Sequence, residues 1–301
     1  MQNIQGWINL YKPKNISSFK AINEIKKKYS IVNIGHAGTL DPLAQGILPI
    51  AVGKATKLIS YINHEFKTYI FTVSWGTQTS TDDSEGKVLF SSEVYPDISD
   101  INNKIIKYIG HIKQVPPKIS AIKINGQRAY KLSRQNINFH IQPKDVYVKS
   151  LKIIEHQTSQ TTFKIECGKG FYIRSLARDI AIELKTYGHV SYLERSKVGK
   201  FTIKNSILLD DLLKIGQRQP EINCIIPTIS MLDDILAYEV VNQNDLENIS
   251  FGRSIKIDES NLTKTHSIDL GKKDIFLSSN GDIVSIGKLT GNLFKPNKVL
   301  I

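Results

Sequence analysis

One carboxylate stands in a setting that suits catalysis, Asp41 in the glycine-rich run GHAGTLDPLAQG of residues 35–46. The following proline disfavours helical geometry at Asp41 and fixes the next φ angle, so a stiff turn holds the carboxylate. No other acidic residue lies within 36–64, whereas His36 and Lys54 offer possible positive charge. A lone carboxylate in basic surroundings stays ionised and can act as a nucleophile or an electrostatic catalyst.

Asp41 also has a structural interpretation. Aspartate before proline is common in turns, because its side chain can hydrogen-bond its own backbone. The turn alone therefore leaves both interpretations open. The longer run GHAGTLDPLAQGILP, residues 35–49, resembles the signature of the tRNA pseudouridine-55 synthases of the TruB type. A match of this length is specific and favours catalysis by Asp41.

A predicted strand carries a second candidate. Residues 66–75 alternate, with Tyr69, Phe71 and Val73 on one face. The pattern places Tyr69 in the core, but a buried hydroxyl needs a partner, which suits the mouth of a pocket. The resemblance identifies Tyr69 with the family's active-site tyrosine.

The run KGFYIR of residues 169–174 opens a predicted helix. Arg174 near a helix start has a charge that opposes the helix dipole, which an acidic partner or simple exposure would explain. The run resembles the family motif whose arginine pairs with the catalytic aspartate. The resemblance therefore implies that Arg174 pairs with Asp41 and that Tyr172 and Leu193 line a uridine pocket.

The resemblance implies substrate contacts for four more residues. Lys12 begins the similarity in Lys-Pro, and Lys123 ends the run PPKISAIK. Asp83 matches the second acid of a polar family loop, although Ser80 stands where an acid is usual. His36 would fill the space left when the target nucleotide leaves its stack.

Composition describes an ordinary globular protein. With 301 residues, 41% hydrophobic and 23% charged, the chain can bury a sizeable core and is expected to form two domains. The start shows no secretory pattern, and no apolar run approaches membrane-spanning length. Cys167 and Cys224 lack a metal-ligand spacing, and no disulfide framework is expected. We therefore expect a cytoplasmic protein without a metal site.

Positive charge is unevenly distributed along the chain. The net charge is +12, and residues 104–174 hold fourteen basic against three acidic residues. Residues 210–260, by contrast, hold four basic against ten acidic residues. This distribution indicates a surface that binds a polyanion. A general drift of composition toward solvated lysines would explain it equally well.

The predicted elements mix helices and strands. Ser17 or Ser18 can cap a helix with apolar positions at Phe19, Ile22, Ile25 and Tyr29. Residues 146–155 and 161–167 alternate as a strand pair, and short strands with glycine turns follow residue 236.

The resemblance implies an α+β fold in two parts. A pseudouridine synthase catalytic domain, with a central mixed or antiparallel sheet flanked by helices, is expected over residues 1–235. A small PUA-like RNA-binding β-barrel is expected over residues 236–301.

The resemblance also implies a reaction, the isomerisation of a uridine to pseudouridine in the T-loop of tRNA, without cofactor or metal. We expect the T-arm as the partner of a monomer that needs no other protein. Two alternatives stay open. One is an RNA-binding or tRNA-folding protein whose catalysis is dispensable, and the other is a guide-dependent enzyme that acts on ribosomal RNA.

Overall fold

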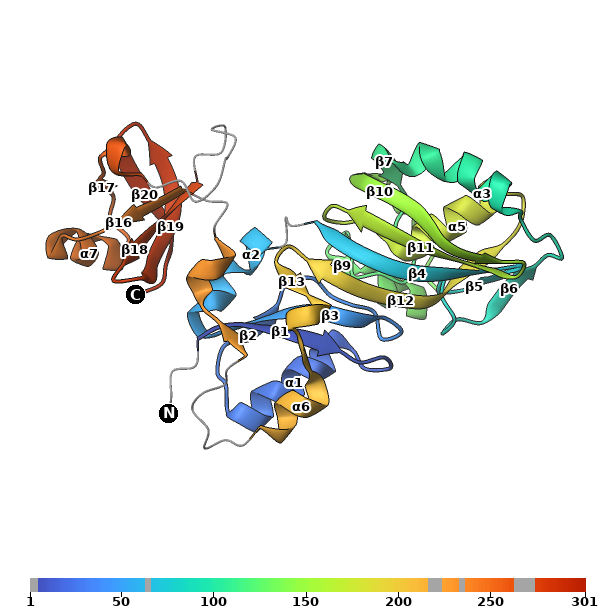
Figure 1. The fold of residues 1–301 in the computed structure, drawn as a ribbon, viewed down its shortest axis with the longest axis horizontal. Coiled ribbons are helices and arrows are strands. Elements are labelled where there is room, and N and C mark those ends of the chain that lie inside the picture. The colour runs from blue at the N-terminus through green and yellow to red at the C-terminus, as the bar shows by residue number, and fades with distance from the viewer. Residues whose placement is uncertain (1–4, 63–65, 216–223, 233–235, 263–273) are drawn as a thin grey trace.

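The protein is described by a computed structural model, which covers residues 5–62, 66–215, 224–232, 236–262 and 274–301. Its centre is a mixed sheet of eleven described strands (Figure 1). Along the main path the order is β14 (Ile207–Leu208), β1 (Gly6–Lys12), β3 (Gln45–Val52), β12 (Gly188–Val198), β4 (Lys67–Trp75), β11 (Gln160–Cys167), β10 (Lys144–Gln157) and β7 (Gly110–Gln114). Three short strands pair beside that path: β2 (Ile34–His36), β13 (Phe201–Thr202) and β15 (Ile225–Ile226).

Most neighbouring strands are antiparallel, as expected for this sheet. Only β1 with β14 and β3 with β12 run parallel among the described pairs of this sheet. The strand pair predicted over residues 146–155 and 161–167 is β10 with β11. The turn between the strands is shorter than the expected residues 156–160, because Gln157 already pairs with Gln160. Two small hairpins lie outside this sheet: β5 (Thr77–Thr79) with β6 (Val88–Ser91), and β8 (Lys123–Ile124) with β9 (Gln127–Arg128).

Helices cover the sheet at two places. Helix α1 (Ser18–Tyr29) packs beside α6 (Leu209–Lys214), and α5 (Ile173–Glu183) packs on β12 and against α3 (Ile98–Ile105) (Figure 1). Shorter helices are α2 (Ile59–Ile62), α4 (Ala129–Arg134), η1 (Gly53–Leu58), η2 (Ile106–Tyr108) and η3 (Ile203–Asn205).

Helix α1 begins as its sequence predicts, since the Ser17 side chain accepts a hydrogen bond from the backbone N–H of Lys20. Ile22 and Ile25 are buried in the core, as expected. Phe19 has the same helical spacing, which predicts that it shares the buried face, but this is wrong, because the residue is 71% exposed. The first turn instead buries the small side chain of Ser18, which lies against the loop before β3.

The C-terminal part forms a separate curled sheet. Its order is β16 (Leu236–Glu239), β18 (Asp274–Ser279), β19 (Asp282–Thr290), β20 (Leu293–Val299) and β17 (Ile255–Lys256), with α7 (Gln243–Ser250) alongside (Figure 1). Phe276 and Ile286 pack into one apolar cluster with Trp7 and Leu58 of the larger part. The short helices η4 (Thr228–Met231) and η5 (Glu259–Asn261) complete the elements. The expected boundary after residue 235 adjoins residues 233–235, which lie outside the described residues, so it stays a prediction.

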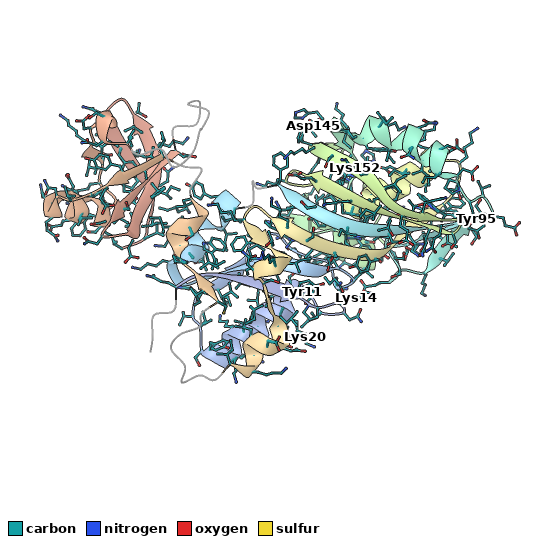
Figure 2. All side chains as sticks on the ribbon, viewed as in Figure 1. Tyr11, Lys14, Lys20, Tyr95, Asp145 and Lys152 are labelled. Carbon is teal, nitrogen blue, oxygen red and sulfur yellow. The ribbon has the colours of Figure 1, made fainter. Side chains whose placement is uncertain are left out.

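Lysines project from widely separated elements. Lys14 lies in the turn before α1, Lys20 in the first turn of α1 and Lys152 on β10, all of them exposed (Figure 2). Across the described ranges, no helix is long and apolar enough to span a membrane.

Candidate active site

The loop between β2 and β3 carries Asp41, whose side chain is 37% exposed. Its preceding residue is fixed by α1, because the Ser18 hydroxyl accepts a hydrogen bond from the N–H of Leu40 (2.9 Å) and donates one to its carbonyl (3.0 Å). The residue after Asp41 is fixed by the backbone N–H of Asn15, which donates to the Pro42 carbonyl at 2.9 Å. The loop therefore holds the carboxylate on both sides.

Arg174, in the first turn of α5, reaches this carboxylate as the resemblance implied. Its Nε lies 2.9 Å from Oδ2 of Asp41, and its side chain is only 6% exposed. The two terminal nitrogens donate to the carbonyls of Thr81 (2.9 Å) and Ile119 (3.1 Å). A buried guanidinium held on three sides in this way fixes both its own position and that of Asp41.

Asp83 lies behind this pair rather than in front of it. Its Oδ2 is 3.6 Å from Nε of Arg174, and its side chain is 4% exposed. Oδ1 accepts hydrogen bonds from the Thr81 hydroxyl and the backbone N–H of Glu85. Asp83 therefore lies against the ion pair and off the cavity wall.

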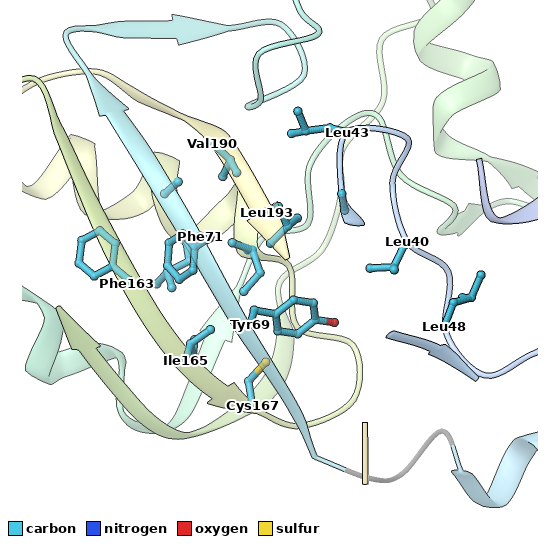
Figure 3. Packing of buried hydrophobic residues seen from close by; sticks show 14 of the residues in the cluster. Leu40, Leu43, Leu48, Tyr69, Phe71, Phe163, Ile165, Cys167, Val190 and Leu193 are labelled. Carbon is cyan, nitrogen blue, oxygen red and sulfur yellow. The ribbon is translucent and has the colours of Figure 1, made fainter. Parts of the chain in front are cut away.

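A cavity of about 340 Å³ opens beside the ion pair. It brings together five of the predicted site residues: Asp41, Tyr69, Tyr172, Arg174 and Leu193. The Tyr69 hydroxyl points away from Phe71 and Phe163 and toward the loop that carries Leu40 (Figure 3). Burial raises the pKa of Tyr69, so its phenol keeps its proton at neutral pH.

Tyr172 is positioned by the end of β7. The side chain of Gln114 donates to the Tyr172 carbonyl at 3.0 Å and accepts from its N–H at 2.9 Å. These two bonds fix the backbone just before α5 begins. Burial raises the pKa of the Tyr172 phenol as well.

Four predicted substrate contacts lie off the cavity wall. Asp83 is behind Arg174, and His36 lies in β2 with its Nδ1 buried and without a hydrogen-bond partner among the residues that the structure describes. Lys123 is exposed in β8. Lys12 is fully buried, and its ammonium donates to the carbonyls of Pro13 (2.8 Å) and Ile16 (2.7 Å). Direct contact with a molecule in this cavity is therefore not supported for these four.

Sequence analysis missed Arg195, Lys67 and Ser120, which also line the cavity. Arg195 could have been found, because it follows Leu193 by two residues on the same strand and so faces the same side of the sheet. Lys67 precedes Tyr69 on β4 by the same spacing. Ser120 lies in an irregular segment, where no such periodicity exists.

Comparison with known proteins identifies the family. The family model described as the N-terminal domain of TruB family pseudouridylate synthases matches residues 26–173. The tRNA pseudouridine synthase B of Ehrlichia chaffeensis is 37% identical, with 98% of each chain covered. The chain belongs to the TruB family. The family member named tRNA pseudouridine synthase B in Mesorhizobium japonicum is 35% identical over 98% of this chain and 96% of that relative.

Solved structures confirm the fold expected for a TruB family chain. One chain of a Cbf5-Nop10-Gar1 complex superposes with a TM-score of 0.74 at 22% identity, covering 98% of this chain and 85% of that one. A chain of an archaeal box H/ACA sRNP Nop10-Cbf5 complex gives a TM-score of 0.72 at 19% identity, covering 98% and 86%. The α+β fold with its mixed sheet and a curled C-terminal sheet is thus confirmed.

Proposed function

We propose that this protein isomerises a uridine of tRNA to pseudouridine, and that its target is position 55 in the T-loop. Full-length similarity to relatives named tRNA pseudouridine synthase B supports the reaction and the RNA class. The observation that carries the proposal is the 2.9 Å contact of Arg174 with Asp41 at the wall of a cavity that Tyr69 also lines.

The chemistry needs one carboxylate and consumes nothing. The bond from the ribose to N1 of the uracil breaks, the base turns, and its C5 bonds to the same ribose carbon before losing a proton. Positive charge develops on the ribose as the first bond breaks, and an ionised carboxylate can stabilise or capture it. Hydrolytic glycosidases generally use two carboxylates. Among the described residues that line this cavity, Asp41 is the only one that carries a carboxylate.

Each wall of the cavity has a role in this proposal. Asp41 acts on the ribose, by attack or by removing a proton, and Arg174 orients it. Tyr69 stacks on the uracil near the carbon that finally loses its proton, while Tyr172 and Leu193 close the sides. Because the site is recessed, the target nucleotide must leave its stack, which costs a few kcal/mol that contacts elsewhere on the RNA must offset.

The proposal extends to the partner and the compartment. The net charge of +12 suits the phosphates of a T-arm. We propose that the chain acts as a monomer in the cytoplasm and needs no guide RNA. Activity of the purified chain on a bare T-arm hairpin tests the last point, since a guide-dependent enzyme would leave that hairpin unmodified.

The decisive experiment replaces Asp41 by asparagine. We expect Asp41→Asn to abolish pseudouridine formation, while affinity for tRNA stays within about 3-fold because the shape is kept. Product is mapped by carbodiimide modification of the tRNA and affinity by filter binding. Pseudouridine formed at the wild-type rate by Asp41→Asn would contradict the proposed role. Refolding of misfolded tRNA, measured in parallel, separates an RNA-folding activity from catalysis.

A further inference from the structure

Arg195 is a buried cation that the mechanism above does not use. It lies in β12, its residue is 1% exposed, and it lines the cavity beside Tyr69. Within the described part of the chain, no carboxylate lies within 4.0 Å of its guanidinium. A buried charge without an ionic partner is costly, so its hydrogen bonds must justify its position.

The hydrogen bonds of Arg195 go to both ends of the loop that carries Asp41, residues 37–44 between β2 and β3 (the Asp41 loop). Nε of Arg195 donates to the Ile47 carbonyl at 2.7 Å, and one terminal nitrogen donates to the Gly38 carbonyl at 2.8 Å. The backbone joins the same loop, because β12 pairs with β3 in parallel and places Arg195 opposite Gly46. One residue thus bridges the start and the end of the segment that carries Asp41.

We propose that Arg195 is a positioning residue of the isomerisation, whose guanidinium bridges the two ends of the Asp41 loop at the wall of the cavity that Tyr69 also lines. This inference rests on the proposed function. Hydrogen bonds at both ends of the Asp41 loop fix the position of its backbone relative to the sheet, whereas Arg174 contacts only the carboxylate. A misplacement of about 1 Å in a catalytic group can cost about 100-fold in rate.

The fork of the guanidinium is essential to this role. Its nitrogens point in fixed, different directions, so one side chain can serve two carbonyls at once. A lysine keeps the charge and also has several donor protons, but its single nitrogen can occupy only one of the two positions from which Nε and the terminal nitrogen of Arg195 donate. Arg195→Lys therefore removes the bridge of two hydrogen bonds without removing the positive charge, and Arg195→Met removes both the bridge and the charge.

The test measures the single-turnover rate at saturating tRNA, the affinity and the melting temperature of each variant. We expect Arg195→Lys to lower the rate about 100-fold, with affinity within about 3-fold of wild type. A residue that only stabilised the fold would lower the melting temperature, yet the folded protein assayed well below it would turn over normally. Amide hydrogen exchange over residues 37–46 should also quicken in Arg195→Lys.

Arg178→Lys serves as the matched control. Arg178 is also a largely buried arginine, but it bonds Asp82 and the Val115 carbonyl and lies off the cavity. Its substitution should leave the saturating rate within about 3-fold of wild type.

The outcomes separate the inference from the proposed function. Wild-type protein that forms no pseudouridine overturns the function itself. Active wild type together with a normal rate in Arg195→Lys overturns the inference alone, as does a loss confined to tRNA affinity. Should Arg195→Met not fold, Arg195→Lys carries the test, because it keeps the buried charge.

Discussion

At the scale of residues, the contacts of Arg174 explain why an arginine is stable near the start of a helix. A positive charge in the first turn of α5 opposes the helix dipole. Asp41 at 2.9 Å and Asp83 at 3.6 Å supply the negative charge that stabilises it there. Exposure, the other explanation, is wrong, because the side chain is only 6% exposed. The helix position alone left both explanations open, and the family resemblance supplied Asp41 as the partner.

Lys12 provides a pH-dependent prediction. Burial lowers the pKa of its ammonium to about 8, from the ordinary 10.5 of the unfolded chain. Between these values the unfolded chain binds the proton and the folded chain has released it, so stability should rise with pH over this window. We expect the free energy of unfolding, relative to Lys12→Met, to rise by about 1 kcal/mol per pH unit. Urea unfolding at pH 8, 9 and 10 measures it, and a difference independent of pH would contradict the buried charge.

At the scale of elements, the loop that carries Asp41, between β2 and β3, is held from three directions. Helix α1 bonds Leu40 through Ser18, the segment before α1 bonds Pro42 through Asn15, and β12 holds the loop ends through Arg195. Several independent restraints on one short loop leave it little freedom, which suits a site whose chemistry depends on orientation.

Gly46 makes the join between the loop and β12 possible. Its φ is +105°, and a Cβ there would lie 2.3 Å from the backbone oxygen of Arg195. We expect Gly46→Ala to lower the free energy of unfolding by about 2 kcal/mol more than Gly110→Ala. Gly110 is the matched control, because its φ is +94° and nothing lies within 4 Å of the added atom. Chemical denaturation compares the two, and equal losses would show that the close approach is unimportant.

At the scale of the whole molecule, the features that bear on the proposed binding of RNA are the net charge of +12 and the arrangement of the two sheets. The larger part holds the cavity, and the curled C-terminal sheet packs on it through Trp7, Leu58, Phe276 and Ile286. Exposed lysines lie far apart in the fold, Lys14 in the turn before α1 and Lys152 on β10 (Figure 2), so in our proposal positive charge is not confined to the rim of the cavity.

The charge distribution predicts strongly salt-dependent binding. Contacts to four or more phosphates release counterions, so affinity for tRNA should fall at least about 100-fold between 50 and 200 mM salt. Filter binding across this range measures the slope. Asp41→Asn should give the same slope as wild type, because the carboxylate makes no phosphate contact in our proposal. A nearly flat dependence would instead show that the lysines are merely solvated.

Local patterns were sufficient for much of the architecture. Alternation identified β4 and the β10–β11 pair, and Ser17 and Ser18 marked the start of α1, where the structure makes Ser17 the cap. The motif around Asp41 identified the family and, through it, the partner at Arg174. Phe19 was misplaced because periodicity gives the faces of a helix but not which face the core covers near its first turn.

The sequence by itself determined the candidate groups in two ways: residue types, turn stiffness and strand alternation are local properties that brought out Asp41 and Tyr69, and the family resemblance added Arg174, Tyr172 and Leu193. Only the tertiary structure decided which groups share the cavity. It turned Lys12 and Asp83 away from the wall and brought Arg195 onto both ends of the Asp41 loop. Pairing between strands and the burial of each side chain depend on segments far apart in the chain, and spacing along one segment does not encode them.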